Sequence, residues 1–242
     1  MNENFDKFDD YVMQFDMNED MIKYKYNHSY RVVHQAEEIC RSLDMDTEER
    51  DLASLIALLH DYARFKQWTI YKTFKDSDSF DHGDEAVKIL FDEGHIKNFI
   101  AKEEDYDVIK KAIANHNKFK LNKKDLNERE LLHSKIIRDA DKIDILYAFS
   151  TNRLLELKND DSEISEKVKE EFMSHGEVLY KDIKNDNDFI ILMIALIYDL
   201  NFDYSKHRVL NENYLNKIYD GVKNKKIFKP FIDEAIKYLK GK

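Results

Sequence analysis

The chain is 242 residues long and carries a formal net charge of −10. This acidic balance disfavours general binding to nucleic acid polymers, because a phosphate backbone needs a basic footprint. The single cysteine, Cys40, excludes an intramolecular disulfide and is typical of a reducing cytoplasm. With only 5 glycines and 1 proline, the sequence has few turn formers for strands and hairpins, so we predict an all-α protein.

Neither the N-terminal residues nor the longest apolar run has the composition or length of a signal peptide or a membrane span. The residues from Met1 to Asp6 are acidic and polar, unlike a secretory signal. The longest apolar run, from Phe189 to Tyr198, has 10 residues and is too short to span a bilayer. We therefore expect a cytoplasmic protein that does not interact with membranes.

Helical spacing of apolar residues begins at the start of the chain. The recurrence from Phe5 to Phe15 predicts an opening amphipathic helix. The next helix is expected from about Met21 to Leu43, and it carries His28. A capping box, Asp46-Thr47-Glu48-Glu49, indicates the start of a third helix, which ends at His60-Asp61.

The middle of the chain alternates an irregular stretch with two further helices. The segment from Tyr62 to Asp81 lacks a clear period and is polar and aromatic, so we expect a functional loop there. A fourth helix is expected from about His82 to a C-cap at Gly94. A fifth is expected from about Tyr106 to near His116.

The second half is expected to contain one long helix and then a smaller set. Asn127 with Glu130 can cap a helix that passes through Asp141 towards Leu157. A polar stretch then indicates a boundary, which divides the chain into a domain of residues 1–157, with its core at about 21–150, and a C-terminal helical extension of residues 158–242 packed on that core. Within the extension we expect helices near Ser162–Met173, Asp186–Asn201, His207–Asp220 and Pro230–Leu239, with Pro230 in the first turn of the last.

One set of residues, His28, the pair His60-Asp61 and Asp141, indicates a metal site. Imidazole and carboxylate together suit Mn, Fe, Co, Ni or Zn, whereas Ca prefers oxygen ligands alone. In this order, and on separate predicted helices, the set resembles the signature of the HD-domain superfamily of metal-dependent phosphohydrolases. The resemblance covers roughly Met21 to Ser150 and implies an HD-domain-like helical bundle with one or two divalent ions, drawn from Mn, Fe, Co, Ni, Zn or Mg.

The residues around each ligand carry the resemblance further. They read His28-Ser29-Tyr30-Arg31-Val32, Leu59-His60-Asp61-Tyr62-Ala63-Arg64-Phe65 and Arg138-Asp139-Ala140-Asp141-Lys142. One departure follows the His-Asp pair, where Ala63 stands at the place of the usual glycine.

Two more histidines stand where two-metal members of the family hold a second ion. They are His82, in Asp81-His82-Gly83-Asp84, and His116, in Asn115-His116-Asn117-Lys118. The resemblance then implies that Asp61 bridges both ions, and two ions can hold the attacking and leaving oxygens of a phosphoryl transfer. The alternative is that both histidines only cap helices around the pocket.

The function implied by the resemblance is hydrolysis of a phosphate ester of a nucleotide or another small phosphorylated metabolite. Asp61 is expected to orient the attacking water, while Arg64 and Lys118 balance the charge on the phosphoryl oxygens. For Arg64 and Lys118 the alternative is a surface salt bridge. Two other interpretations stay open: a di-iron oxygenase with the same ligand set, and a regulatory module that binds metal without turnover.

Overall fold

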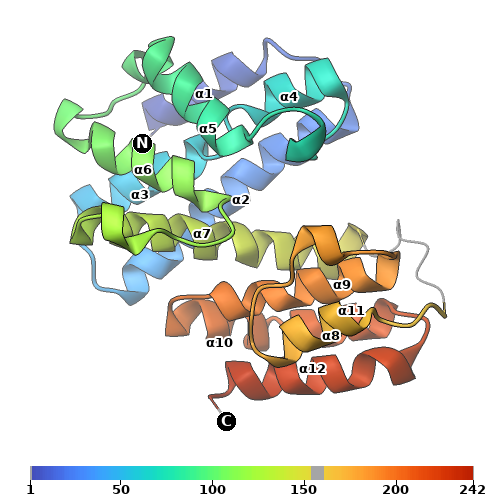
Figure 1. Ribbon diagram of the computed structural model, residues 1–242. Coiled ribbons are helices and arrows are strands. Elements are labelled where there is room, and N and C mark those ends of the chain that lie inside the picture. Colours follow the sequence, from blue (N-terminus) through green and yellow to red (C-terminus); the bar gives the residue numbers. More distant parts are fainter. Residues whose placement is uncertain (1, 154–160, 242) are drawn as a thin grey trace. The chain divides into compact units, whose positions relative to one another are not determined.

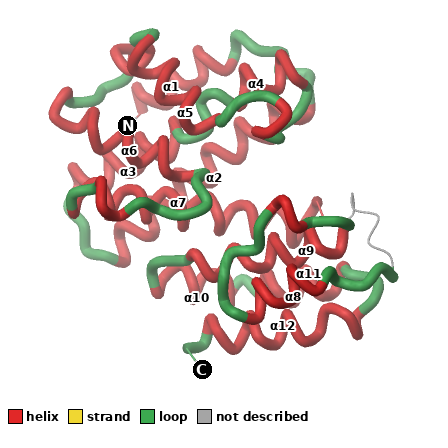
Figure 2. Tube along the Cα trace, in the orientation of Figure 1, coloured by secondary structure: helices red, strands yellow, loops and turns green. Residues whose placement is uncertain are grey.

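The protein is helical throughout the part of the chain that the structure describes. This structure is a computed structural model, and it describes residues 2–153 and 161–241. Within these ranges, helices are joined by loops and short turns, and there is no strand (Figure 2). The predicted all-α fold class is thus confirmed.

The chain divides into two compact units, unit 1 (Met1–Asp141) and unit 2 (Lys142–Lys242). The division falls inside a helix, α7 (Glu128–Ala148). The boundary expected after residue 157 lies outside the described residues, and the packing of the C-terminal extension on the core stays a prediction. None of the helices in the described part of the chain combines the length and the apolar character that crossing a membrane requires.

Unit 1 is built around two long helices that pack along each other, α2 and α3 (Figure 1). Helix α3 also contacts α1 and α6, and α5 packs against α6. Buried aliphatic side chains such as Ile39, Leu58 and Ile113 fill the space between these helices. The helices of this unit before α7 are α1 (Asn2–Val12), α2 (Asp20–Ser42), α3 (Thr47–Leu59), α4 (Arg64–Tyr71), α5 (His82–Val87) and α6 (Tyr106–His116).

The expected caps form at two of the helix starts. The Asp46 side chain accepts a hydrogen bond of 2.9 Å from the Glu49 N–H at the start of α3. Before α7, the Glu130 N–H donates to Asn127 Oδ1 at 2.9 Å and the Asn127 N–H donates to Glu130 Oε2 at 2.8 Å. Both pairs satisfy amides that have no partner within the helix, which is why these residues mark helix starts.

The segment from Tyr62 to Asp81 is not the irregular loop that we expected. It contains α4 and a 3-10 turn at Asp76–Asp78. Phe65 of α4 is fully buried and its ring lies against those of Phe8 and Phe15. Tertiary contacts of Phe65 and of the fully buried Gln67 therefore stabilise a short helix whose own sequence has no clear period.

Unit 2 places α12 (Lys225–Leu239) against α8, α9, α10 and α11. Two expectations were wrong here. The helix expected at His207–Asp220 is two helices, because the chain turns at Asn213, which has φ of 61°. The last helix begins five residues earlier than expected, with Asn224 as its N-cap, so Pro230 lies inside the helix. The other bounds are α8 (Glu166–Met173), α9 (Asp186–Ala195), α10 (Asp203–Asn211) and α11 (Tyr214–Gly221).

The long helix α7 passes through Asp141 as predicted. It ends at Ala148 and continues as a π-helical turn at Phe149–Arg153, and the expected end at Leu157 lies outside the described residues.

Candidate metal centre

All the side chains predicted as metal ligands meet inside unit 1. They come from five elements: His28 from α2, His60-Asp61 from the end of α3, His82 from the first turn of α5, His116 from the end of α6, and Asp141 from α7. The histidines and Asp61 are buried, and the side chain of Asp141 is 15% exposed. Residues separated by more than a hundred positions thus form one cluster.

The two carboxylate oxygens of Asp61 face different pairs of histidines. Oδ2 lies 3.3 Å from His28 Nε2 and 3.4 Å from His60 Nε2. Oδ1 lies 3.5 Å from His82 Nε2 and 3.7 Å from His116 Nε2. Asp61 therefore stands between two adjoining sets of donor atoms, which is the arrangement of a bridging carboxylate.

Two overlapping groups of donor atoms have the spacing and chemistry for a divalent ion, and His60 belongs to both. One ligand atom from each of His28, His60 and Asp141 lies within 4.8 Å of the others, and the same holds for His60, Asp61 and His116. Asp141 Oδ1 lies 3.1 Å from His28 Nε2. Mixed imidazole and carboxylate donors at this spacing fit a transition metal ion.

Two of the histidines are oriented by hydrogen bonds between their second ring nitrogen and a backbone carbonyl. His60 Nδ1 lies 2.7 Å from the Ala57 carbonyl oxygen, and His116 Nδ1 lies 2.6 Å from that of Ile113. A proton on Nδ1 donates to the carbonyl and leaves the lone pair of Nε2 directed at the cluster. This is the tautomer that a metal ligand needs.

The protonation states also suit metal binding. Burial, reinforced by the charge of Arg64, lowers the pKa of His82 to about 3, and burial lowers the pKa of His116. Burial by itself raises the pKa of Asp61, but the nearby charges of Lys25 and His60 outweigh it and hold this pKa well below its usual value. Near neutral pH the imidazoles of the second donor set are thus neutral and the carboxylate is ionised, the forms that bind metals.

Lys25 is a cationic neighbour of the cluster that the sequence did not single out. Its Nζ lies 2.5 Å from Asp61 Oδ2, its side chain is only 12% exposed, and it lies over the ring of Phe74. The available signal was its position three residues before His28, on the same face of α2.

Arg64 lies beside the cluster, and its bonds attach it to the surrounding protein. Its Nη1 donates to Gln67 Oε1 at 2.5 Å, to the Phe74 carbonyl at 2.7 Å and to Asp76 Oδ1 at 2.9 Å. Its Nε lies 3.5 Å from Asp61 Oδ1. This geometry supports a role in holding Asp61, while the expected contact with phosphate stays a prediction.

Lys118 follows α6 in the chain, and its side chain reaches the start of α5. Its Nζ is 2.8 Å from Asp81 Oδ2 and 2.8 Å from Asp84 Oδ2. Asp81 is the N-cap of α5, so Lys118 stabilises the turn that presents His82. Its expected contact with substrate likewise stays a prediction.

The turn after the His-Asp pair is tight although alanine replaces the usual glycine. The N–H of Tyr62 donates to the Leu59 carbonyl at 3.1 Å, and that of Arg64 donates to the Asp61 carbonyl at 2.9 Å. The Tyr11 hydroxyl from α1 donates to the Tyr62 carbonyl at 3.0 Å, and the two rings stack with centroids 3.7 Å apart. Tyr11 of helix α1 therefore holds this turn in place through its contacts with Tyr62.

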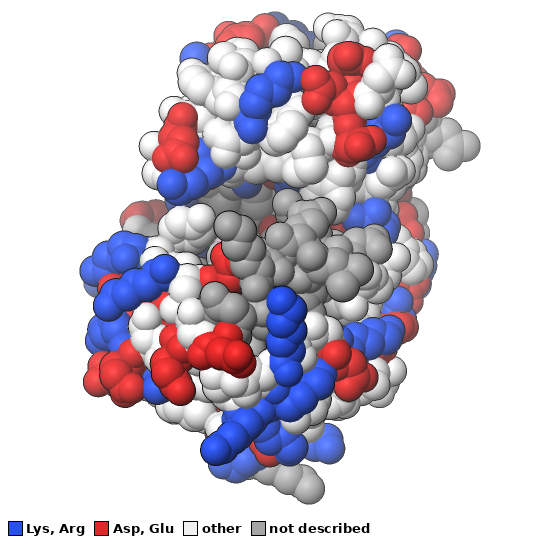
Figure 3. Space-filling model, turned by 90° about the vertical axis from the view of Figure 1, so that its right-hand side faces the viewer, with Lys and Arg blue, Asp and Glu red and all other residues white. Residues whose placement is uncertain are grey.

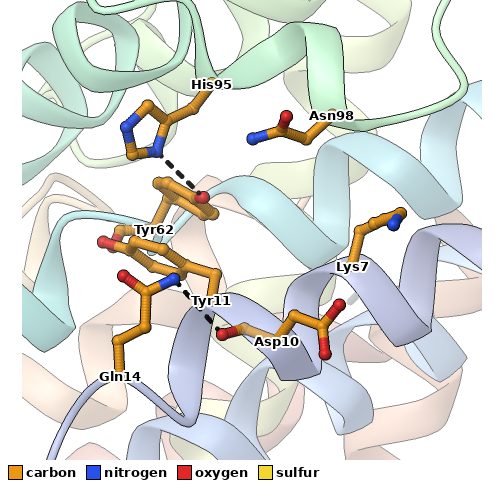
Figure 4. A pocket seen from close by; sticks show the side chains of 7 residues that line it. All are labelled: Lys7, Asp10, Tyr11, Gln14, Tyr62, His95 and Asn98. Carbon is orange, nitrogen blue, oxygen red and sulfur yellow. Dashed lines mark hydrogen bonds between the residues drawn. The ribbon is translucent and has the colours of Figure 1, made fainter.

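A cavity of about 240 Å³ lies against this stacked pair, on the side that Figure 4 shows. Two residues that line the cavity, Tyr62 and His95, are joined by a hydrogen bond of 3.2 Å between the Tyr62 hydroxyl and His95 Nδ1. The other lining residues are Lys7, Asp10, Gln14 and Asn98. None of the predicted ligands lines this cavity, so it is separate from the metal centre.

The family model for the HD domain matches residues 26–146, half of the chain. The matched range includes every predicted ligand, from His28 to Asp141. No curated protein and no solved structure matches the chain.

Proposed function

The chain belongs to the HD-domain family, and from this we propose that it is a metal-dependent phosphohydrolase that cleaves a phosphate ester of a nucleotide or another small phosphorylated metabolite. The observation that carries the proposal is the position of Asp61. Its two oxygens face two histidine pairs, so the cluster offers donors for two adjoining ions instead of one. Single-site metal binding would need only one of these sets.

The residues divide between the two ions by their distances. His28, His60 and Asp141 would hold the first. His82 and His116, whose Nε2 atoms lie 3.5 and 3.7 Å from Asp61 Oδ1, would hold the second, and Asp61 would contact both. Bound there, Mn, Fe, Co, Ni, Zn or Mg would lower the pKa of a bound water and polarise a phosphoryl oxygen.

The protein's own groups supply the rest of the reaction environment. The buried carboxylate of Asp61 accepts hydrogen bonds in its ionised form and is placed to orient a water molecule. Lys25 brings a positive charge to within 2.5 Å of this carboxylate, and Arg64 to within 3.5 Å. In an acidic protein, cations at the site itself favour the binding of an anionic substrate.

The surface supports a small substrate over a nucleic acid polymer. On the face drawn in Figure 3, acidic and basic side chains are interspersed. With a net charge of −10, attraction for phosphate is thus a local property of the centre.

The test combines metal analysis with a substrate panel. We expect purified protein to carry a divalent transition metal and to hydrolyse members of a panel of nucleotides and phosphomonoesters. His60→Ala and Asp61→Ala should lose metal and activity together, because no neighbouring side chain can replace either donor. His34→Ala is the matched control, since His34 lies exposed on α2 and outside the cluster.

Other results would select the alternatives. Oxygen consumption by iron-loaded protein that is inert toward phosphoesters would identify an oxygenase. Metal-replete protein without either activity would identify a regulatory module. Wild-type metal content in both His60→Ala and Asp61→Ala would contradict the metal centre itself.

A further inference from the structure

We propose that Asp76 is a positioning residue for the second ion: by holding the ring of His82, it sets the affinity of the His82 and His116 side of the centre. The inference rests on the proposed function, because it assumes that a second ion binds there. Asp76 lies in the turn between α4 and α5, six residues before His82, whose ring it orients.

The first observation is the bond between the two side chains. Asp76 Oδ2 lies 2.6 Å from His82 Nδ1, on the side of the ring opposite the cluster. The other ring nitrogen, Nε2, lies 3.0 Å from His116 Nε2 and 3.5 Å from Asp61 Oδ1. A proton on Nδ1 donated to Asp76 therefore leaves the lone pair of Nε2 facing the donors of the second ion.

The second observation is that His82 is held differently from His60 and His116. His60 and His116 lie at the ends of helices, and each is held by a backbone carbonyl one turn earlier. His82 begins a helix of six residues, so no earlier turn of that helix can hold it. A carboxylate from another turn takes over this function, and a charged acceptor makes the imidazole a stronger donor to a metal than a carbonyl does.

The third observation is that Asp76 is itself held in place. Its Oδ1 accepts hydrogen bonds from Arg64 Nη1 at 2.9 Å and from Gln67 Nε2 at 3.0 Å. Gln67 also donates to Ser79 Oγ at 2.8 Å and to the Phe80 carbonyl at 3.1 Å. These bonds fix the carboxylate against both α4 and the turn that precedes α5, which is what a positioning group requires.

The effect should be confined to one side of the centre. The bonds of Asp76 lead to His82, to side chains of α4 and to Asn117, the residue after His116, and its link to the shared Asp61 runs through Arg64. Loss of the carboxylate should therefore weaken the second ion and spare the first.

The experiment is a titration of metal-free protein with Mn²⁺, in which the affinities of both ions are measured for wild type, Asp76→Asn and His82→Ala. We expect Asp76→Asn to weaken the second ion about 10- to 100-fold, the usual effect of losing such a partner, and to leave the first unchanged. Asp78→Asn is the matched control: it makes the same chemical change in the same turn, where Asp78 bonds only exposed neighbours among the contacts described.

A double-variant comparison distinguishes positioning from general support of the fold. If Asp76 acts through His82, adding Asp76→Asn to His82→Ala should cause no further change in metal binding. Equal weakening of both ions by Asp76→Asn, or no weakening of either, would overturn the inference. A wild type that binds only one ion would instead contradict the two-ion form of the proposed function.

A measurement on the wild type covers the case in which Asp76→Asn does not fold. In ¹⁵N spectra of zinc-loaded protein, the signals assigned to His82 by their loss in His82→Ala should show a protonated Nδ1. A protonated Nε2 on His82 would overturn the inference without any variant of Asp76.

Discussion

At the scale of single residues, the negative charge of one buried carboxylate, that of Asp61, is compensated by the cations around it. Asp61 is 2% exposed and lies within reach of Lys25 and Arg64 as well as the histidines. Of the two cations, Arg64 is bonded through Nη1 to three acceptors of the protein, whereas the one polar contact of Lys25 Nζ within the described part of the chain is with Asp61 Oδ2, the oxygen that faces His28 and His60. Lys25 is therefore the better placed of the two to exchange a protein contact for one with substrate.

Lys25→Ala is predicted to lower kcat/KM by about 10- to 100-fold and to leave the metal bound. The reason is that a hydrogen bond to a charged group contributes about 1.5–3 kcal/mol, while an ammonium group cannot ligate the ion. The measurement is kcat/KM on the substrate found in the panel, with metal content determined on the same sample. Lys23→Ala is the control, since Lys23 lies on the same helix and its Nζ is 4.0 Å from the exposed Asp20.

Two results would contradict this role for Lys25. Unchanged kcat/KM would show that its charge does not reach the substrate. Loss of metal would show that it only holds Asp61 in position.

The sequence predicted which histidines and aspartates would be candidate ligands, and the structure brings them together, but the residues that contact and orient them could not be predicted. His60 and Asp61 are adjacent and His28 and Asp141 flank them in order, so the pattern itself carries the signal. Asp76 and Lys25 have no such pattern. Asp76 reaches His82 only because α4 and the turn after it fold as they do, and the sequence of that segment predicted a loop.

At the scale of elements, the second donor set depends on how closely α5 approaches α6. Gly83 lies at this contact, and a Cβ atom there would be 3.1 Å from the Ile113 carbonyl oxygen and 2.7 Å from Asn117 Oδ1. The first of these atoms belongs to the backbone of α6 and cannot rotate away. Glycine thus permits the approach that places His82 Nε2 3.0 Å from His116 Nε2.

Gly83→Ala is predicted to separate α5 from α6 and to weaken the second ion more than the first. The physical reason is overpacking, which costs about 1–3 kcal/mol where the backbone must shift. The Mn²⁺ titration measures both affinities, and chemical denaturation measures the stability. Lys88→Ala, at an exposed position directly after this helix, is the control. Unchanged affinity for the second ion in Gly83→Ala would show that α6 yields without moving its histidine.

Whether a helix could be predicted depends on whether local or long-range contacts stabilise it. The caps before α3 and α7 are local, because a side chain bonds an amide three residues away, and sequence shows such pairs directly. Helix α4 is stabilised by contacts of Phe65 with Phe8 and Tyr11 of α1, which lie more than fifty residues earlier in the chain. The break at Asn213 depends on a left-handed backbone conformation that asparagine tolerates but does not require.

At the scale of the whole molecule, the division into two units separates the metal centre from the rest of the chain. Every predicted ligand belongs to unit 1, and Asp141 is its last residue. The only tryptophan of the sequence, Trp68, also lies in unit 1, where its indole N–H donates to Glu19 Oε2 at 3.1 Å. Tryptophan fluorescence therefore reports the unfolding of the unit that carries the centre.

Metal is predicted to stabilise the transition reported by Trp68. A ligand that binds only the folded state stabilises it by RT ln(1 + [L]/Kd), which is about 2.7 kcal/mol at one hundred times Kd. Adding Zn²⁺ to metal-free protein should therefore shift the fluorescence midpoint in urea to higher concentration, and the shift should disappear in His60→Ala and persist in His34→Ala. An equal shift in His60→Ala would mean that the ion stabilises the protein from another site. The absence of any shift in the wild type at saturating Zn²⁺ would mean that the ligand cluster binds the folded and unfolded chains alike, contrary to a centre assembled from five separate elements that only folding brings together.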